Sequence, residues 1–170
     1  MTKKNLVLLG MMGVGKSTLG KIIAKKQGFE FIDTDRKIEE KCSMKISEIF
    51  RKKGEKFFRL EEEKEVLKCL KKNNCVIALG GGAFLNNIVR SNILKNTVSV
   101  WLDSNLSTLN RRTQWSKKRP LLNKGDNYKK IIELYAERKN IYKLADYKIN
   151  CNNLSKEKIS KKIIEYYETH

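Results

Sequence analysis

Several residue types that support common kinds of protein are scarce in this 170-residue chain. It contains one proline, which argues against proline-rich linkers. No run of apolar residues is long enough to span a bilayer, and the apolar run near the amino terminus is too short for a signal peptide. We therefore expect a soluble cytoplasmic protein with no membrane segment.

Cysteine and histidine are also sparse and poorly placed for metal binding. The four cysteines, Cys42, Cys69, Cys75 and Cys151, form no C-x-x-C pair, and the single histidine is the last residue, His170. A structural zinc site needs closely spaced Cys or His ligands, so the sequence argues against one. If the protein is an enzyme, Asp, Glu, Lys or water must move the proton, because no internal histidine can act as a general base.

Acidic residues are fewer than basic ones, with 19 Asp and Glu against 37 Lys and Arg, which gives a formal net charge of +18. The lysines are spread along the chain and often lie beside glutamate, as in Glu61-Glu-Glu-Lys-Glu65. Nucleic-acid binding needs clustered positive charge, so we expect no nucleic-acid partner. The positive field would still attract a small anionic substrate such as a nucleotide.

Short apolar runs alternate with stretches that have helical spacing of apolar residues. The predicted strands are Leu6–Leu9, Phe29–Ile32, Val76–Leu79, Val98–Leu102 and Tyr147–Ile149. The predicted helices are Lys16–Gln27, Ile38–Phe50, Glu55–Leu70, Leu106–Thr113, Tyr128–Ala145 and Ile159–Tyr167. Strands that alternate with helices predict an α/β fold in three layers, with a parallel sheet covered on both faces. The length suits a single domain.

The first predicted strand runs into the segment Gly10-Met-Met-Gly13-Val-Gly15-Lys16-Ser17, which fits the phosphate-binding pattern G-x-x-x-x-G-K-[ST]. Glycines let backbone N–H groups surround phosphate oxygens, and the start of the following helix favours negative charge. Lys16 is expected to reach the β- and γ-phosphates, and the Ser17 hydroxyl to ligate Mg²⁺. The pattern predicts a nucleoside triphosphate as one substrate and leaves the phosphoryl acceptor open.

Asp33 is the best candidate for a second magnesium ligand. It ends the second predicted strand, whereas the third predicted strand ends in three glycines and offers no acid. The alternative for Asp33 is a helix cap, although Asp35 is the more natural cap by position. We expect Ser17 and Asp33 to hold the metal.

Further motifs follow the phosphate loop in a fixed order. They are Asp33-Thr-Asp35, Phe58-Arg59-x-x-Glu62, Gly80-Gly81-Gly82, Arg119-Pro-Leu-Leu122 and Glu137-Arg138-x-x-x-Tyr142. Together they resemble the shikimate kinase family, and the resemblance runs from the first strand to about Ala145. It implies a nucleoside-monophosphate-kinase-like P-loop fold with a five-stranded parallel sheet and a mobile lid at about 113–124. The core would comprise 1–34, 71–112 and 125–170, with substrate-binding helices at about 35–70.

The resemblance also implies the reaction, which is MgATP-dependent phosphorylation of the 3-hydroxyl of shikimate in the pathway to aromatic amino acids. Asp35 would hold the acceptor ring by its hydroxyls, and a carboxylate there can orient a hydroxyl and accept its proton. Arg59 and Arg138 match the pair that grips the substrate carboxylate, for which the planar guanidinium is suited. Glu62, three residues after Arg59 on a helix, would orient that guanidinium.

The remaining site residues are also implied by the resemblance. The backbone of Gly80, Gly81 and Gly82 would approach the acceptor closely, and Arg119 would swing over the transferring phosphate with Lys16 and Asp35 as catalytic partners. Arg112 would lie near the adenine, although the adjacent Arg111 could serve instead. The full set expected to bind ATP is Gly13, Val14, Gly15, Lys16, Ser17, Thr18, Arg112 and Arg119.

The chain departs from the family pattern at two places. Val14 replaces a smaller residue in the loop, and Cys151-Asn152-Asn153 stands where the family often has an arginine by the adenine. The second departure puts the adenine contacts at that end of the chain in doubt. Two alternatives to shikimate phosphorylation stay open. One is another small P-loop kinase, for gluconate or a nucleoside monophosphate, and the other is a basic P-loop binding protein without small-molecule turnover. We expect the protein to act as a monomer.

Overall fold

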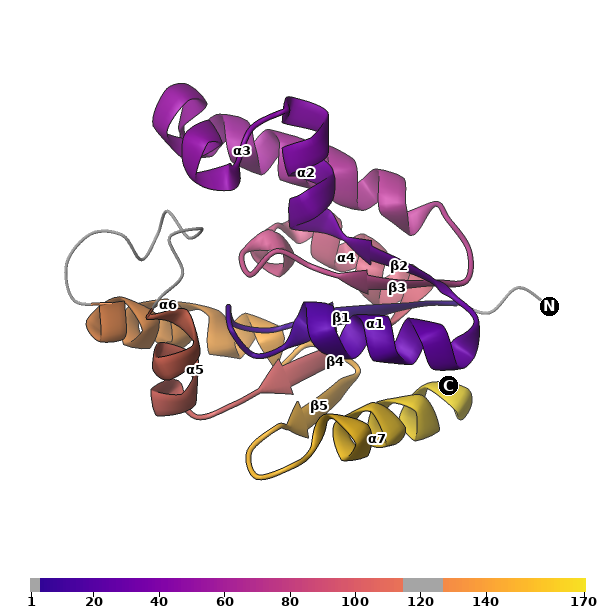
Figure 1. Cartoon of the computed structure of the whole chain (residues 1–170). Helices are drawn as coiled ribbons and strands as arrows, with labels where there is room; N and C mark the ends of the chain where they lie inside the picture. The colour runs from indigo at the N-terminus through magenta and orange to yellow at the C-terminus, as the bar shows by residue number, and fades with distance from the viewer. Residues whose placement is uncertain (1–3, 115–126) are drawn as a thin grey trace.

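The computed structural model describes residues 4–114 and 127–170, and it has the expected α/β architecture (Figure 1). Five parallel strands form one sheet in the order β2-β3-β1-β4-β5. The strands are β1 (Asn5–Leu9), β2 (Glu30–Asp33), β3 (Cys75–Ala78), β4 (Thr97–Asp103) and β5 (Tyr147–Asn150). In the three central strands nearly every residue is buried, as expected for a parallel sheet with helices on both faces.

Helices surround this sheet on both sides. The helices are α1 (Lys16–Gln27), α2 (Thr34–Cys42), α3 (Ile46–Leu70), α4 (Asn87–Asn96), α5 (Leu106–Thr113), α6 (Asn127–Tyr142) and α7 (Lys156–Glu168), with a short 3₁₀ turn at Ala83–Leu85. In Figure 1, α1 and α7 lie in front of the sheet and α4 lies behind it, whereas α2 and the start of α3 lie beyond the β2 edge. The fold is therefore the predicted three-layer arrangement.

The predicted helical segments agree with the structure in part. Lys16–Gln27 and Leu106–Thr113 have the predicted bounds. The single helix predicted over Ile38–Phe50 is wrong, because α2 ends at Cys42 and α3 begins at Ile46. Ser43 has a left-handed φ of 50° and its N–H bonds back to Glu40, which ends the helix.

The helix predicted to begin at Glu55 is the second half of α3. Gly54, with a φ of 84°, kinks α3 directly before Glu55, and nothing surrounds the position of a Cβ there. Helix α4 was not predicted at all. The residue type that could have predicted its start is Asn86, because asparagine is a favoured N-cap. The Asn86 side chain caps the helix by accepting from the N–H groups of Ile88 and Val89.

Two apolar cores hold the molecule together. The larger lies between the sheet and its helices, and it includes every residue from Leu6 to Leu9. A smaller cluster of Ile38, Ile49 and Phe58 joins α2 to both halves of α3. This second core supports the side chains of α2 and α3 that face the carboxyl end of the sheet.

No helix within residues 4–114 and 127–170 has the length and apolarity that crossing a membrane requires.

The buried amide of Asn5 fixes the amino end of the sheet. Its Nδ2 donates to the carbonyl of Lys72 at 2.7 Å, and its Oδ1 accepts the N–H of Cys75 at 2.9 Å. Asn5 is only 5% exposed, and its bond to the N–H of Cys75 is buried, so that N–H would lose its partner if the side chain were removed. One side chain thus sets where β3 begins beside β1.

We expect Asn5→Ala to lower the free energy of unfolding by about 1–3 kcal/mol, because it leaves the buried N–H of Cys75 unpaired and removes the bond to the carbonyl of Lys72. Urea denaturation followed by circular dichroism measures this change. The exposed Asn96 provides a control, and Asn96→Ala should change the stability by less than about 0.5 kcal/mol. Equal effects of the two substitutions would show that Asn5 does not fix the strand.

Candidate active site

The phosphate loop connects β1 to α1 and depends on glycine at its first residue, Gly10, and in its middle, at Gly13. Gly10 and Gly13 have φ values of 138° and 80°. A Cβ on Gly10 would lie 2.4 Å from the carbonyl oxygen of Leu102, and one on Gly13 would lie 2.9 Å from the methyl group of Thr113. Both the backbone conformation and the lack of space therefore require glycine, and the loop packs closely against β4 and α5.

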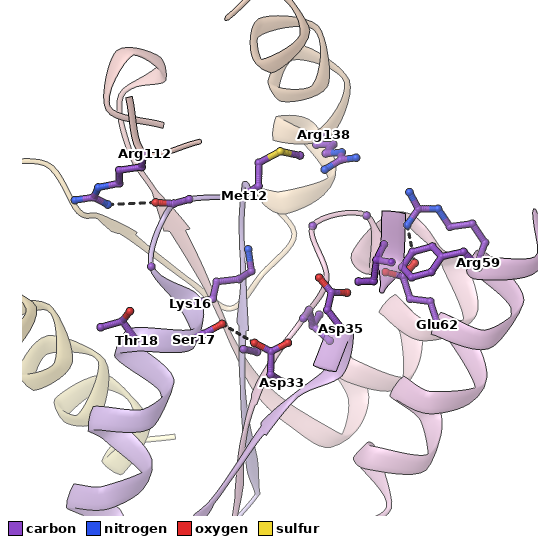
Figure 2. Close-up of a pocket in the computed structure, with 18 of the residues that line it drawn as sticks. Met12, Lys16, Ser17, Thr18, Asp33, Asp35, Arg59, Glu62, Arg112 and Arg138 are labelled. Carbon is purple, nitrogen blue, oxygen red and sulfur yellow. Dashed lines mark hydrogen bonds and ion pairs between the residues drawn. The ribbon is translucent and has the colours of Figure 1, made fainter. Parts of the chain in front are cut away.

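Lys16 and Ser17 begin helix α1 directly behind this loop (Figure 2). The Lys16 ammonium donates to the carbonyls of Gly10 and Met11 at 2.8 and 3.0 Å, so the lysine folds back across the loop. The Ser17 hydroxyl donates to Oδ2 of Asp33 at 2.6 Å. The predicted lysine, serine and aspartate thus lie together at the carboxyl ends of β1 and β2.

The Ser17 and Asp33 oxygens fit a small hard cation. Mg²⁺ prefers oxygen ligands and commonly takes only one or two from the protein, with phosphates and water completing its shell. In the described part of the chain, no group of three or more His, Cys, Asp or Glu side chains could hold a metal. The adjacent hydroxyl and carboxylate therefore suit a magnesium ion that arrives with a nucleotide. Asp33 also caps α2 through the N–H of Arg36.

The acceptor side of the pocket is built by α2 and α3. Figure 2 shows Asp35 between the Ser17–Asp33 pair on one side and Arg59 with Glu62 on the other. The Arg59 guanidinium donates to Glu62 Oε2 at 2.7 Å and to Glu55 Oε1 at 3.2 Å. The predicted orienting contact between Glu62 and Arg59 is confirmed.

Arg138 reaches the same place from α6 and is 3% exposed. Its Nη1 lies 3.0 Å from the position that a Cβ of Gly81 would occupy. Its Nε has no hydrogen-bond partner among the described residues, and no ion pair to Arg138 occurs within them. A buried guanidinium with an N–H that has no partner is suited to bind a carboxylate.

The glycine segment after β3 makes room for these charged groups. A Cβ on Gly80 would lie 2.5 Å from Asp35 Oδ1 and 2.6 Å from Glu62 Oε1, and one on Gly82 would lie 2.6 Å from Arg59 Nη1. None of the three glycines has a positive φ. Glycine is therefore required at these positions because a larger side chain would not fit, and not because of the backbone conformation.

The Asp35 carboxyl is the most perturbed acid of the site. Burial raises the pKa of Asp35 from 3.8 to about 7, and the charges of Glu62 and Asp33 add to the rise against the opposing charges of Lys16 and Arg59. Burial also raises the pKa of Glu62, although Arg59 and Arg138 oppose the change. Asp35 Oδ1 and Glu62 Oε1 are both buried without a partner among the described residues. Both oxygens can accept a hydrogen bond from a ligand.

A cavity of about 410 Å³ joins the two halves of the site. The predicted residues that line it are Gly13, Gly15, Lys16, Ser17, Thr18, Asp33, Asp35, Arg59, Gly81, Gly82, Arg112 and Arg138. Val14 and Gly80 are not among its lining residues, and Arg119 and Trp115 lie outside the described part of the chain. Most of the lid expected at about 113–124 also lies outside it.

Sequence reasoning missed the apolar wall of this cavity. Met12, Ile46, Phe50 and Phe58 line it beside the charged groups. The helical spacing of Ile46 and Phe50 marks one face of α3, which could have indicated a shared surface. An apolar wall beside paired arginines suits a carboxylic acid with a compact carbon ring.

The backbone N–H of Gly80 is bonded within the protein, and the predicted approach of Gly80 to the acceptor stays a prediction. Its N–H donates to the Thr34 hydroxyl at 3.0 Å, so it is already bonded without a ligand.

At the other end of the pocket, the Arg112 guanidinium donates to the carbonyl of Gly13 at 3.3 Å. Asn152 holds the loop before α5 by accepting from Ser104 and Asn105.

The carboxyl ends of a parallel sheet here bring together a phosphate loop and a basic pocket for an acidic acceptor. This arrangement defines the class of P-loop kinases, in which one end of the sheet holds both substrates. The sequence model of the shikimate kinase family matches residues 12–168. The chain therefore belongs to the shikimate kinase family.

Relatives and solved structures agree with this assignment. The chain is 43% identical over 164 residues to a shikimate kinase of Sulfurihydrogenibium sp., covering 95% of this chain and 96% of that protein. It is 42% identical to one of Caldanaerobacter subterraneus, with 96% of each chain covered. A structure of shikimate kinase from Acinetobacter baumannii in complex with shikimate superposes with a TM-score of 0.95 at 32% identity, covering 99% of this chain and 94% of that one.

More distant structures share the fold alone. A gluconokinase from Sinorhizobium meliloti superposes with a TM-score of 0.63 at 13% identity, covering 99% of this chain and 93% of that one. This similarity agrees with a common P-loop kinase architecture and says nothing about the acceptor.

The raised pKa of Asp35 predicts a pH-dependent effect on stability. The folded state holds the Asp35 proton up to about pH 7, whereas the unfolded chain releases it near 3.8, so this contribution to stability is complete below about pH 3.8 and is lost as the pH rises from there to about 7. Asp35→Asn keeps the side chain neutral. In buffer with EDTA and no nucleotide, it should raise the free energy of unfolding at pH 8 by about 1–3 kcal/mol, and the gain should vanish near pH 4. A gain of equal size at both pH values would contradict the raised pKa.

Proposed function

We propose that this protein transfers the γ-phosphoryl group of ATP to the 3-hydroxyl of shikimate, giving shikimate 3-phosphate and ADP. The observation that carries this proposal is the placement of Arg59, Arg138 and Asp35 in the same cavity as the phosphate loop. The two arginines can bind a carboxylate, Asp35 can bind a hydroxyl, and the loop can bind the triphosphate. Shikimate carries its carboxylate and its hydroxyls on one small ring, so it presents these groups together.

Asp35 is proposed to orient the attacking hydroxyl and accept its proton. In the ligand-free site its pKa is raised to about 7, so a substantial fraction is ionised at neutral pH. A general base works best when its pKa lies near the working pH. The proton leaves the hydroxyl as its oxygen forms a bond with the γ-phosphorus, while the bond from that phosphorus to the β-γ bridging oxygen breaks.

Lys16 and the loop are proposed to hold the phosphates, and Ser17 with Asp33 to hold Mg²⁺. When bound, the magnesium ion offsets the negative charge of the β- and γ-phosphates. Lys16 adds a positive charge on the protein side, and the N–H groups at the start of α1 add partial positive charge. Phosphoryl transfer needs positioning and charge neutralisation more than covalent help from the protein.

The remaining assignments stay predictions of the sequence. Arg119 would act on the transferring phosphate and Arg112 near the adenine, while Thr18, Val14 and Gly80 complete the predicted set. The division into a core and substrate-binding helices at about 35–70 agrees with the separate apolar cluster of α2 and α3. A monomeric state, a cytoplasmic location and the lack of a nucleic-acid partner are likewise predictions.

The proposed reaction is tested by ADP release from MgATP with shikimate, gluconate or a nucleoside monophosphate as acceptor. We expect release with shikimate, and its loss in Arg59→Ala. Arg51 is exposed on the same helix and away from the cavity, so Arg51→Ala should keep the activity. Turnover only with gluconate or a nucleotide would overturn the proposed acceptor.

The geometry of Arg138 predicts that charge alone cannot replace it. Arg138→Lys keeps the positive charge but loses the planar fork, so the affinity for shikimate should fall by about 2–5 kcal/mol. Titration calorimetry with shikimate measures this change, and binding of ATP to the same variant should stay as in the unmodified protein. An unchanged shikimate affinity would remove Arg138 from the binding site.

A further inference from the structure

Thr34, the residue between Asp33 and Asp35, is fully buried and bonded on both sides of its hydroxyl. Its Oγ1 accepts the N–H of Gly80 at 3.0 Å and donates to the carbonyl of Ala78 at 3.3 Å. The side chain is 0% exposed, so no water competes for these bonds. Neither the nucleotide site nor the acceptor site described above includes Thr34.

The position of Thr34 explains why a hydroxyl is needed there. Strands β2 and β3 are paired up to Asp33 and Ala78, and the ladder ends at that pair. After this pair, α2 begins at Thr34, and the N–H of Leu79 donates to the carbonyl of Leu8 in β1, on the other side of β3. The N–H of Gly80 has lost its strand partner, and the Thr34 hydroxyl replaces it. The threonine thus extends the ladder by one step with its side chain.

Gly80 is the residue whose position matters most to the acceptor carboxylates. Its Cα lies directly beside Asp35 Oδ1 and Glu62 Oε1, because a Cβ there would be 2.5 and 2.6 Å from them. Asp35 follows Thr34 in the chain. The Thr34 side chain therefore fixes the glycine segment relative to the Asp35 carboxylate that faces it. Movement of the segment or of the carboxylate would change the distance between the acceptor and the phosphate.

We propose that Thr34 is a positioning residue for phosphoryl transfer, and that its hydroxyl holds Gly80 and Asp35 in register. The inference rests on the proposed function, because its kinetic readout uses shikimate. Small displacements of a reacting group lower rates strongly, and a shift of about 1 Å can cost about 100-fold. Loss of the hydroxyl should therefore act on acceptor turnover and leave the binding of nucleotide unchanged.

The test compares Thr34→Val, which keeps the shape and loses the hydroxyl, with Thr34→Ser, which keeps the hydroxyl. For Thr34→Val we expect kcat/KM for shikimate to fall by about 10- to 100-fold, with the KM for MgATP within about twofold of the unmodified protein. Thr34→Ser should restore kcat/KM to within about threefold. Equal losses in both variants would show that the site responds to any change of the side chain and not to the hydroxyl, and would overturn the proposal.

Thr97 supplies a matched control at the opposite end of the sheet. It is also buried, and its hydroxyl donates to the carbonyl of Ile93 at 2.8 Å at the start of β4. Thr97→Val should lower the thermal midpoint, as Thr34→Val should, and leave kcat/KM unchanged. If Thr97→Val lowers kcat/KM as much as Thr34→Val does, the effect is one of general stability and the proposal fails.

Hydrogen exchange of the Gly80 amide gives a readout that does not depend on activity. Its exchange should accelerate by at least about tenfold in Thr34→Val and remain slow in Thr34→Ser and Thr97→Val. Faster exchange with unchanged kinetics would show that the bond exists but does not position the reaction. An unmodified protein that is inactive with shikimate would instead overturn the proposed function, while the exchange result would still report on the Thr34 bond.

Discussion

The lack of side chains at Gly80, Gly81 and Gly82 is the constraint on which the acceptor site depends. Four charged groups approach this segment, with Asp35 coming from α2, Arg59 and Glu62 from α3, and Arg138 from α6. Every one of them lies where a methyl group on a glycine would intrude. The segment follows the inner strand β3, so its position is fixed by the sheet, and the three helices bring their charged groups to it.

Charges that gather in this way are incompletely paired by the protein. Asp35 Oδ1, Glu62 Oε1 and Arg138 Nε are buried without partners among residues 4–114 and 127–170. Buried polar groups without partners are rare in folded proteins because each lowers stability. Here the groups without partners include two hydrogen-bond acceptors, on the carboxyls, and one donor, on the guanidinium. A ligand with hydroxyls and a carboxylate complements both kinds, so the binding energy is concentrated at the groups that the fold leaves unpaired.

The sequence allowed the local parts of the fold to be predicted. The phosphate pattern located the loop and the start of α1, and the spacing of three residues between Arg59 and Glu62 predicted their contact, found at 2.7 Å. These features lie within one element or at its junction. The break between α2 and α3 was missed because Ser43 ends α2 in a left-handed conformation that neither its residue type nor apolar spacing predicts.

Features that join distant segments could not be derived in the same way. The bond from Gly80 to Thr34 spans 46 positions and depends on how far β2 and β3 stay paired. The apolar wall of Met12, Ile46 and Phe50 likewise needs the phosphate loop and α3 to face each other. The family resemblance named the charged residues of the acceptor site. Their separation, and the space that the glycines leave for them, appear only once the chain is folded.

Gly80, Gly81 and Gly82 serve to leave space for charged groups, and Gly82→Ala tests this role most directly. The φ of Gly82 is −97°, so alanine fits the backbone and only its methyl group matters, at 2.6 Å from Arg59 Nη1. Because the long Arg59 side chain can move aside, the fold should keep its thermal midpoint, while calorimetry should show at least about a tenfold loss of shikimate affinity with ATP affinity unchanged. Unchanged shikimate affinity in a folded Gly82→Ala protein would contradict the account.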